Sequence, residues 1–389
     1  MTAFTRATRI SDLEISEIVQ LSEKAAALKS AGRDVVALST GEPDFPTPDH
    51  VIEAAHQAAL AGKTRYPATL GTAELRAAIA AQNGVTAAEV IVGTGAKQVL
   101  ANAMLASLTD GDEVIMPAPY WTSYSDIVLM AGGRPVVIPC AMAAGFKLSP
   151  EALEAAITPR TRWLMLNSPS NPSGAIYSPD EIRALAAVLA RHPQVWVLSD
   201  EIYRHLSYIP FTPFREAAPE LSDRLLTVDG VSKAYSMTGW RIGWGTGPVA
   251  LIKAMGAVQG QVTSGACSIA QAAALAALTG EQALLDLRLA ELRRRRDRVV
   301  AALNTLPGIA CPSPDGAFYV FPRIAEAIVT TGHADDAAFC RWLLEDHGLA
   351  LVPGRAFGLP GHLRLSFAYS NDDLEKGLSR LADALQARR

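Results

Sequence analysis

Short apolar runs alternate with segments of helical periodicity along the first two thirds of the chain. The runs are rich in β-branched residues, which favour strands. They cover residues 90–92, 113–116, 136–138, 163–166, 195–199, 225–228 and 241–244. Helices are expected at residues 16–31, 48–61, 72–82, 96–108, 120–131, 149–157 and 178–191. Short apolar strands separated by helices indicate an α/β fold with a mostly parallel sheet flanked by helices on both faces.

The pattern changes after residue 268, where a long helical region continues to about Leu306. Strands are then expected around residues 317–321, 349–352 and 363–367, and helices at 334–347 and 371–387. This order of elements predicts a smaller α+β domain. The run Arg293–Arg296 is flanked by acidic residues, so we expect it to form a solvated helix face.

Composition narrows the class of protein. The 389 residues include 35 Lys plus Arg and 39 Asp plus Glu, a formal net charge of −4, and 49% are hydrophobic. These values exclude a disordered chain and argue against a nucleic-acid partner. No apolar run reaches the ~18 residues of a membrane span, and acidic residues interrupt the N-terminal stretch, so we expect neither a membrane partner nor a signal peptide. Because four scattered cysteines and seven scattered histidines show no metal-ligand spacing, we expect a cytoplasmic protein without a metal.

One lysine stands out from the eight in the chain. Lys233 lies between a predicted strand end and the next strand, in the segment V-S-K-A-Y-S-M-T-G-W-R of residues 231–241. Ligands bind at strand ends in parallel sheets. Ser232 and Arg241 offer a hydroxyl and a forked donor suited to phosphate. This arrangement points to a lysine that forms a Schiff base beside a phosphate group.

The chain resembles the class I aminotransferases, pyridoxal-phosphate enzymes of fold type I, and within them the bacterial aspartate aminotransferase branch. Three further segments carry the resemblance: L-S-T-G-E-P-D-F at 38–45, N-S-P-S-N-P-S-G at 167–174 and L-S-D-E-I-Y at 198–203. The resemblance implies a pyridoxal 5'-phosphate cofactor and a transaminase that moves an amino group from an L-amino acid to a 2-oxoacid by a ping-pong mechanism. We expect a large cofactor-binding domain over residues 41–289. Residues 1–40 and 290–389, from both chain ends, would form the small domain.

The resemblance also implies roles for individual residues. Lys233 would form the Schiff base and shuttle the proton, while Asp200 would keep the pyridine nitrogen protonated, since a nearby carboxylate favours the charged form. Asn171 and Tyr203 would bond the phenolic oxygen, and Trp121 would stack on the ring. The catalytic residues would thus be Lys233, Asp200 and Tyr203.

Phosphate and substrate contacts follow from the same resemblance. Residues 92–97, V-G-T-G-A-K, combine a strand end, a small-residue turn and a helix start, which suits a phosphate. The expected phosphate contacts are Gly95, Ala96, Lys97, Ser232 and Arg241. Tyr66 would reach the phosphate of a neighbouring subunit, which implies a homodimer with shared active sites. The substrate would meet Gly41, Trp121, Asn171 and Arg364, with Arg364 on its α-carboxylate.

The amino donor stays open at this point. Lys97 matches a lysine that meets the distal carboxylate in related bacterial aspartate enzymes, which favours an acidic substrate. Glu14 would oppose a second carboxylate by like-charge repulsion, and residues 261–268 also depart from the family pattern. Aromatic or prephenate-type substrates, and an eliminating lyase of the same fold, remain alternatives. We also expect a cis peptide bond before Pro119 or Pro172.

Overall fold

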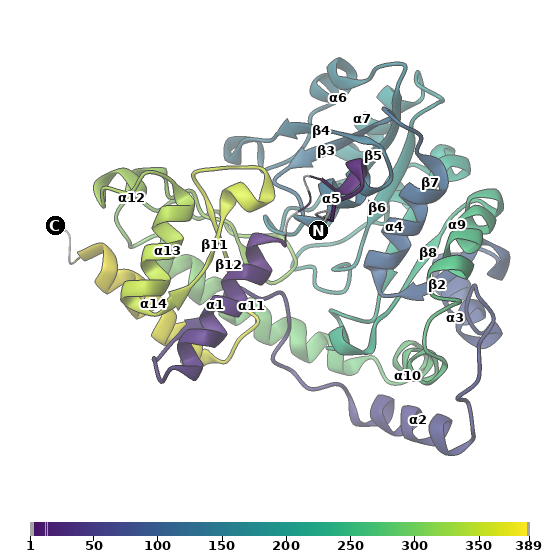
Figure 1. Ribbon diagram of the computed structural model, residues 1–389, viewed down its shortest axis with the longest axis horizontal. Coiled ribbons are helices and arrows are strands. Elements are labelled where there is room, and N and C mark those ends of the chain that lie inside the picture. The colour runs from purple at the N-terminus through teal and green to yellow at the C-terminus, as the bar shows by residue number, and fades with distance from the viewer. Residues whose placement is uncertain (1–3, 12, 14, 387–389) are drawn as a thin grey trace.

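A central seven-stranded sheet organises the computed structural model, which describes residues 4–11, 13 and 15–386. Its strands lie in the order β2-β8-β7-β6-β5-β3-β4 (Figure 1). The bounds are β2 (Val90–Thr94), β3 (Glu113–Ala118), β4 (Arg134–Pro139), β5 (Thr161–Asn167), β6 (Trp196–Asp200), β7 (Leu225–Gly230) and β8 (Ile242–Thr246). β8 runs antiparallel to both neighbours, and the pairs from β7 to β4 are parallel. The predicted α/β fold with a mostly parallel sheet is confirmed.

Both faces of this sheet are buried, as the apolar strands predicted. Successive side chains of a strand point to opposite faces. Accordingly, Val114 and Met116 pack in one core cluster with α4, α5 and α9, whereas Ile115 packs in another with α6, α7 and α8. The flanking helices of this larger part are α2 (Asp49–Leu60), α3 (Ala73–Asn83), α4 (Ala96–Ser107), α5 (Ser123–Met130), α6 (Pro150–Ala156), α7 (Pro179–Leu189), α8 (Phe214–Ala217), α9 (Val249–Val262) and α10 (Ser268–Thr279).

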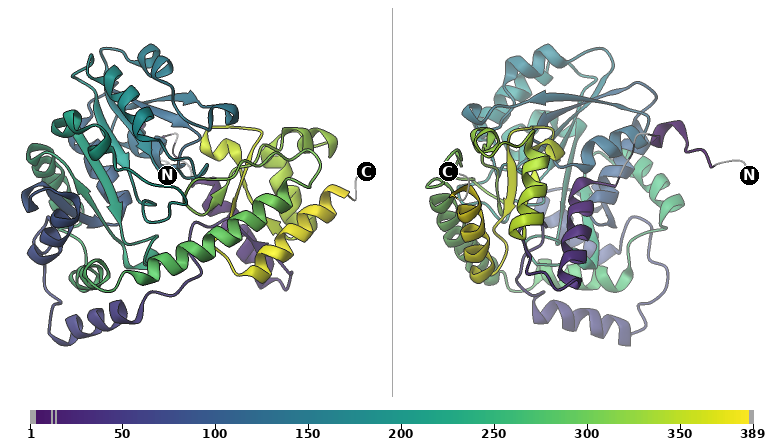
Figure 2. Two further views of the ribbon diagram at one scale, coloured as in Figure 1. Left: turned by 180° about the vertical axis from the view of Figure 1, so that it is seen from behind. Right: turned by 60° about the vertical axis from the view of Figure 1, so that its left-hand side comes forward.

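The smaller part of the molecule draws on both ends of the chain. Strand β1 (Val36–Ala37) pairs in parallel with β10 (Leu349–Ala350), and β11 (Val352–Pro353), β12 (Leu363–Ser366) and β9 (Tyr319–Val320) form a second small sheet. Its helices are α1 (Glu17–Ser30), α12 (Ala325–Thr330), α13 (Asp336–His347) and α14 (Asn371–Gln386). The long helix α11 (Ala283–Leu303) runs along the back of both parts (Figure 2).

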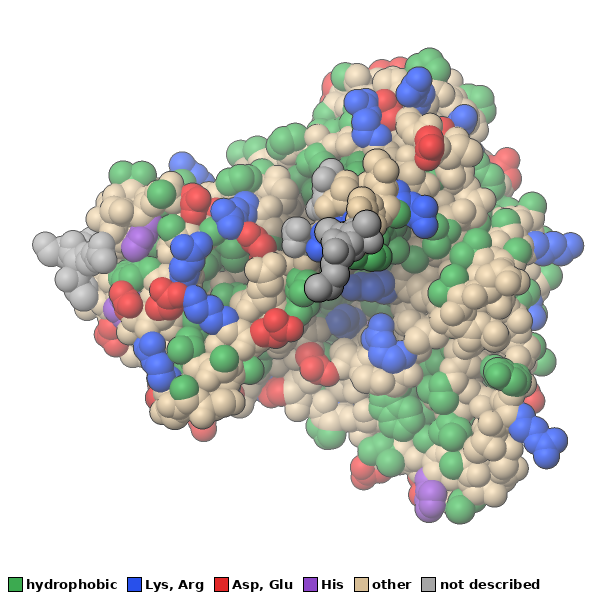
Figure 3. Space-filling view, viewed as in Figure 1, with side chains coloured by type: hydrophobic (Ala, Val, Ile, Leu, Met, Phe, Trp, Pro, Cys, Tyr) green, Lys and Arg blue, Asp and Glu red, His purple; other side chains and the backbone are tan. Residues whose placement is uncertain are grey.

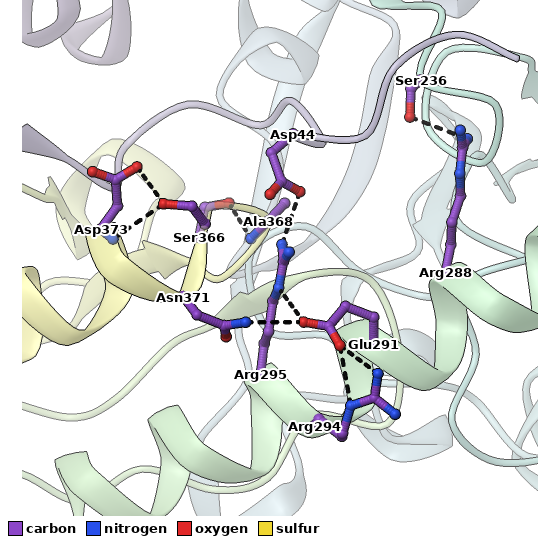
Figure 4. Close-up of polar contacts among 11 residues, drawn as sticks. Asp44, Ser236, Arg288, Glu291, Arg294, Arg295, Ser366, Ala368, Asn371 and Asp373 are labelled. Atoms are coloured by element: carbon purple, nitrogen blue, oxygen red, sulfur yellow. Dashed lines mark hydrogen bonds and ion pairs between the residues drawn. The ribbon is translucent and has the colours of Figure 1, made fainter.

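The arginine run on α11 differs from the expected solvated face. Arg294 is exposed, but Arg295 is 6% exposed and donates from Nη1 to Asp44 Oδ1 at 2.8 Å and from Nε to Glu291 Oε1 at 3.0 Å (Figure 4). Glu291 also accepts hydrogen bonds from Arg294 and Asn371. The prediction was wrong for Arg295 because its partner, Asp44, lies 251 residues away in the sequence.

Several elements were not predicted from sequence. The helical region after residue 268 is interrupted at Gly280, which separates α10 from α11. Helices α9 and α12 and the two-residue strand β1 were also missed. Cis peptide bonds precede both Pro119 and Pro172, as expected, and a further one precedes Pro169. None of the described helices combines the length and the apolar character needed to cross a membrane.

Candidate functional site

A cavity of about 290 Å³ opens where the ends of β6 and β7 meet the start of α4 and residues of the smaller part. In the space-filling view, Lys and Arg side chains lie in the hollow at the centre of this face (Figure 3). The cavity is lined by Ile18, Gly41, Ala96, Lys97, Trp121, Tyr124, Asn167, Asn171, Asp200, Ile202, Tyr203, Ser232, Lys233, Thr238, Arg241, Tyr319 and Arg364. Its position agrees with the rule that ligands bind beyond the carboxyl ends of parallel strands.

Lys233 brings an amine into the cavity from the loop after β7. Its Nζ donates a hydrogen bond to the carbonyl oxygen of Gly41 at 2.7 Å. Burial, together with the positive charges of Arg364 and Arg241, lowers the pKa of Lys233 to about 8, although Glu42 opposes the shift. The amine is therefore neutral in a larger fraction of molecules near neutral pH than an ordinary lysine is.

Asp200 places a carboxylate at the end of β6, where it is 4% exposed. The hydroxyl of Tyr124 donates to Oδ2 at 2.6 Å, and the amide of Ile202 donates to Oδ1 at 3.2 Å. Burial raises the pKa of Asp200 to about 6, against these hydrogen bonds and the charge of Lys233. A positive charge brought against this carboxylate would favour its ionised form.

Arg364 supplies a buried cation from β12, a strand of the small three-stranded sheet. The residue is 2% exposed. Its Nη1 donates to Asn171 Oδ1 at 2.9 Å, and its Nη2 donates to the carbonyl oxygen of Ser39 at 2.5 Å. The guanidinium lies over the ring of Tyr319, 4.5 Å from its centroid. Its Nε is buried without a hydrogen-bond partner, and no carboxylate of the described residues forms an ion pair with the guanidinium. Such a cation is ready to pair with an anionic ligand.

An anion-binding geometry is built around the start of α4. Gly95 precedes the helix with φ of +80°, and no acidic residue lies in its first turn. A Cβ at Gly95 would lie 2.6 Å from Arg241 Nη2, and one at Gly243 would lie 2.2 Å from the amide nitrogen of Ala96. The absence of these side chains lets the arginine and β8 approach the helix start, where amides and the helix dipole favour anions.

Aromatic and hydroxyl groups complete the lining. Lys97 Nζ lies 4.7 Å from the ring centroid of Trp121, and burial, with the charge of Arg241, lowers the pKa of Lys97. The hydroxyls of Tyr203 and Tyr319 are 2.9 Å apart. The side chain of Asn167 accepts from the amide of Asn171 at 2.7 Å and donates to the carbonyl oxygen of Asp200 at 2.9 Å. Asn167 thus fixes two site segments relative to each other.

The structure brings together all the sequence-predicted site residues except Gly95 and Tyr66. Gly95 lies at the N-cap of α4, directly before lining residue Ala96. Tyr66 is 93% exposed and does not line the cavity of its own chain. Glu14 lies outside the described residues, and the 261–268 segment contributes no lining residue of this cavity. Nor do the described residues contain a metal-binding group of three or more His, Cys, Asp or Glu.

Sequence reasoning missed other lining residues, among them Tyr124, Asn167 and Tyr319. Asn167 lies within the quoted segment 167–174, so its motif was a usable signal. Tyr124 follows Trp121 by one helical turn, but its partner Asp200 is 76 residues away. No local pattern links these two residues.

Known proteins resemble this chain over nearly its whole length. Residues 33–381 match the family described as aminotransferase class I and II. The aspartate/prephenate aminotransferase of Cereibacter sphaeroides is 52% identical over 379 residues, which cover 94% of this chain and 95% of that protein. An aspartate aminotransferase of Rhizobium meliloti is 51% identical, covering 98% and 96%.

Solved structures agree with the sequence relatives. The crystal structure of the Rhizobium meliloti aspartate aminotransferase superposes with a TM-score of 0.94 at 50% identity, covering 99% of each chain. The Thermus thermophilus aspartate aminotransferase with maleate has a TM-score of 0.93 at 40% identity, covering 98% of this chain and 100% of that one. The chain belongs to the class I and II aminotransferase family and is a pyridoxal-phosphate-dependent aminotransferase.

Proposed function

We propose that this aminotransferase moves the amino group of an acidic L-amino acid, of the aspartate or glutamate type, to a 2-oxoacid by a ping-pong cycle. One observation carries the proposal: Arg364 and Lys97 both line the cavity, and no carboxylate of the described residues lies within ion-pair distance of either. Asp126 acts on Lys97 only from a longer distance, where its charge raises the pKa of Lys97 against the effect of burial. A substrate with two carboxylates would pair with both cations, whereas a neutral side chain would leave Lys97 with only the more distant charge of Asp126.

The relatives support the acidic substrate. Those at about half identity carry the names aspartate and aspartate/prephenate aminotransferase, and the Thermus thermophilus structure was solved with maleate, a dicarboxylate. Prephenate also carries two carboxylates, so prephenate is our second candidate, as an acceptor of the same amino group. An eliminating lyase is not favoured, because these relatives are named as aminotransferases.

The cavity residues fit pyridoxal phosphate, and we assign each a place from its chemistry. The amine of Lys233 would hold the aldehyde carbon, and the carboxylate of Asp200 would pair with the ring nitrogen. Asn171 and Tyr203 would bond the phenolic oxygen, and Trp121 would cover the ring. The phosphate would be held by Ser232, Arg241 and the amides of Gly95, Ala96 and Lys97.

When bound, pyridoxal phosphate supplies an electron sink that stabilises negative charge at the substrate α-carbon. Lys233 would transfer the proton, because a pKa of about 8 makes its amine a usable base near neutral pH. The hydrogen bond to the carbonyl oxygen of Gly41 fixes the position of the Lys233 Nζ atom. Arg364 and the backbone at Gly41 would orient the α-carboxylate. Asp200, buried and bonded on both oxygens, would hold the ring proton in place.

Assembly and location form a second part of the proposal. Tyr66 would reach the phosphate of a partner subunit in a homodimer; its 93% exposure and that of Leu60 (70%), six residues earlier on α2, support an interface there.

Residues 41–289 would form the large domain and 1–40 with 290–389 the small one, with the second boundary inside α11. The free cysteines Cys140, Cys311 and Cys340 are buried, which suits a reducing cytoplasm.

A panel of half-reactions tests the substrate class. The holoenzyme is mixed with single amino acids, and the cofactor absorbance reports amino transfer. We expect aspartate and glutamate to react in preference to alanine or phenylalanine. Lys97→Met should lower kcat/KM for aspartate at least about tenfold while leaving alanine nearly unchanged, because one ion pair to a desolvated carboxylate is lost.

Matched variants interpret this result. Lys253→Met, on the exposed face of α9, removes the same charge far from the lining and should change neither substrate. Arg364→Lys should weaken all amino acids together, since every substrate has an α-carboxylate. Equal losses for alanine and aspartate in Lys97→Met would argue against the acidic specificity. Conversion of the aminated enzyme back by prephenate would establish the second candidate.

A further inference from the structure

We propose that Tyr124 is a positioning residue for Asp200: its hydroxyl holds the carboxylate in one orientation and in its ionised form, ready for a cationic ring nitrogen. This inference rests on the proposed role of Asp200 as the partner of that nitrogen. Tyr124 itself belongs to none of the motifs that identify the family in this sequence. It is found only through its contacts in the folded protein.

The geometry around Tyr124 is closely defined. The residue lies in the first turn of α5, is 2% exposed, and donates from its hydroxyl to Asp200 Oδ2 at 2.6 Å. Its backbone amide donates to the carbonyl oxygen of Trp121 at 2.9 Å, and the two rings meet edge to face with centroids 5.5 Å apart. A ring held at both its backbone and its edge gives its hydroxyl one direction, toward Asp200.

The roles of donor and acceptor are also fixed. Burial and the negative charge of Asp200 raise the pKa of Tyr124 well above its usual value, so its hydroxyl keeps its proton at physiological pH. Tyr124 is therefore the donor, and the acceptor is a carboxylate whose second oxygen already accepts from Ile202. With one donor on each oxygen, the carboxylate cannot rotate without breaking a hydrogen bond in a buried site, which is costly.

The hydrogen bond from Tyr124 also lowers the pKa of Asp200, which burial raises. Burial disfavours the ionised form of Asp200, and hydrogen bonding to the charged form restores it. Glu201 and Asp229 repel the charge of Asp200, and the charge of Lys233 opposes this repulsion. The charged and titratable groups around Asp200 are Lys233 from the loop after β7, Asp229 at the end of β7, Glu201 and Tyr203 after β6, and Arg204, which pairs with Asp229 at 3.6 Å.

Removing one hydroxyl tests this inference. Tyr124→Phe keeps the ring and deletes the donor. Tyr208→Phe is the matched control, because Tyr208 is also buried and donates its hydroxyl, at 2.7 Å, to the carbonyl oxygen of Ala317 rather than to Asp200. Asp200→Asn serves as the reference for loss of the carboxylate. Cofactor affinity is read from quenching of tryptophan fluorescence in the apoprotein, and the pH midpoint of the cofactor absorbance is titrated in the holoenzyme.

We expect Tyr124→Phe to weaken cofactor binding about tenfold or more, the size expected for a hydrogen bond to a charged group. The absorbance midpoint should rise, because a less ionised Asp200 leaves less positive charge on the ring. Replacement of Tyr124 by 3-fluorotyrosine keeps the shape and makes a stronger donor, so this midpoint should fall. Tyr208→Phe should change neither quantity.

The outcomes separate the inference from the proposal beneath it. Wild-type affinity and midpoint in Tyr124→Phe, together with weak binding in Asp200→Asn, would overturn the role of Tyr124 alone. Wild-type behaviour of Asp200→Asn would overturn the proposed role of Asp200 and the inference with it. An equal loss in Tyr124→Phe and Tyr208→Phe would show a general effect of buried hydroxyls and also contradict the inference.

Discussion

The Nζ atom of Lys233 lies 2.7 Å from the carbonyl oxygen of Gly41, a residue 192 positions earlier in the chain. Gly41 follows the short strand β1, whose partner β10 belongs to the smaller part of the molecule, whereas Lys233 follows β7 of the large sheet. The contact therefore places the reacting amine beside the proposed start of the large domain, directly after the segment that carries β1. Any shift of the segment that holds Gly41 would alter the direction of this nitrogen.

Lys233 should be the residue that binds the cofactor covalently. Borohydride reduction of the holoenzyme, followed by peptide mass mapping, should place the added mass on the peptide containing Lys233. Attachment to the apoprotein should accelerate as pH rises through about 8, because the neutral amine is the nucleophile and its pKa is lowered to about 8. Lys233→Ala should lose both the label and the activity. A label on Lys97, or retained turnover in Lys233→Ala, would contradict the assignment.

Gly41 should not tolerate a side chain. A Cβ at this position would lie 2.2 Å from the hydroxyl oxygen of Tyr319, which is 1% exposed and bonded to Tyr203. Gly41→Ala should therefore lower stability by about 1–3 kcal/mol and reduce kcat/KM, as overpacking does. Thermal unfolding and half-reaction rates measure the two effects.

A second substitution separates sterics from chemistry at this site. Tyr319→Phe removes the clashing oxygen, and the next atom, the ring Cζ, lies 3.3 Å from the added Cβ. The double variant Gly41→Ala with Tyr319→Phe should regain most of the stability lost in Gly41→Ala, which a double-mutant cycle would measure as coupling. If the losses of stability in the two single variants simply add in the double variant, the Tyr319 hydroxyl is not what opposes the added Cβ.

The large sheet was predictable because its signals are local. Strands buried on both faces appear in the sequence as short apolar runs, and each expected run lies within or overlaps an observed strand. Helix α9 was missed for a physical reason. It contains Gly256 and Gly260, which are poor helix formers, yet a Cβ at Gly256 would lie 2.5 Å from Leu70 Cδ2. Close packing, which sequence alone does not show, accounts for a glycine there.

The site residues also fall into two groups, those with a local sequence signal and those that depend on distant contacts. Lys233, Arg241 and Asp200 were found because each lies in a segment with a strand end and a recognisable motif. Tyr124 and Tyr319 were missed because their roles depend on partners far along the chain, at Asp200 and Tyr203. Strand β1 was missed because two residues carry no periodicity, and only pairing with β10 defines the strand.

Arg295 should contribute far more stability than its neighbour Arg294, although both lie on α11 and both pair with Glu291. The side chain of Arg295 is 7% exposed and pairs with Asp44 and Glu291, whereas that of Arg294 is 73% exposed. Arg295→Met would leave a partly buried Asp44 without this cation, at a cost of about 3 kcal/mol, while Arg294→Met should cost less than about 1 kcal/mol.

Thermal unfolding of the two variants at several pH values measures this difference. Arg294, Arg295 and Asn371 lower the pKa of Glu291 by hydrogen bonds, so the stabilising interaction is present above the ordinary glutamate pKa and is lost as pH falls through the lowered value. The gap between Arg295→Met and the wild type should therefore narrow in acid. High salt should erase the small effect of Arg294→Met first, because exposed pairs are screened more strongly. Equal destabilisation by both substitutions would show that burial of the Arg295 pair adds nothing.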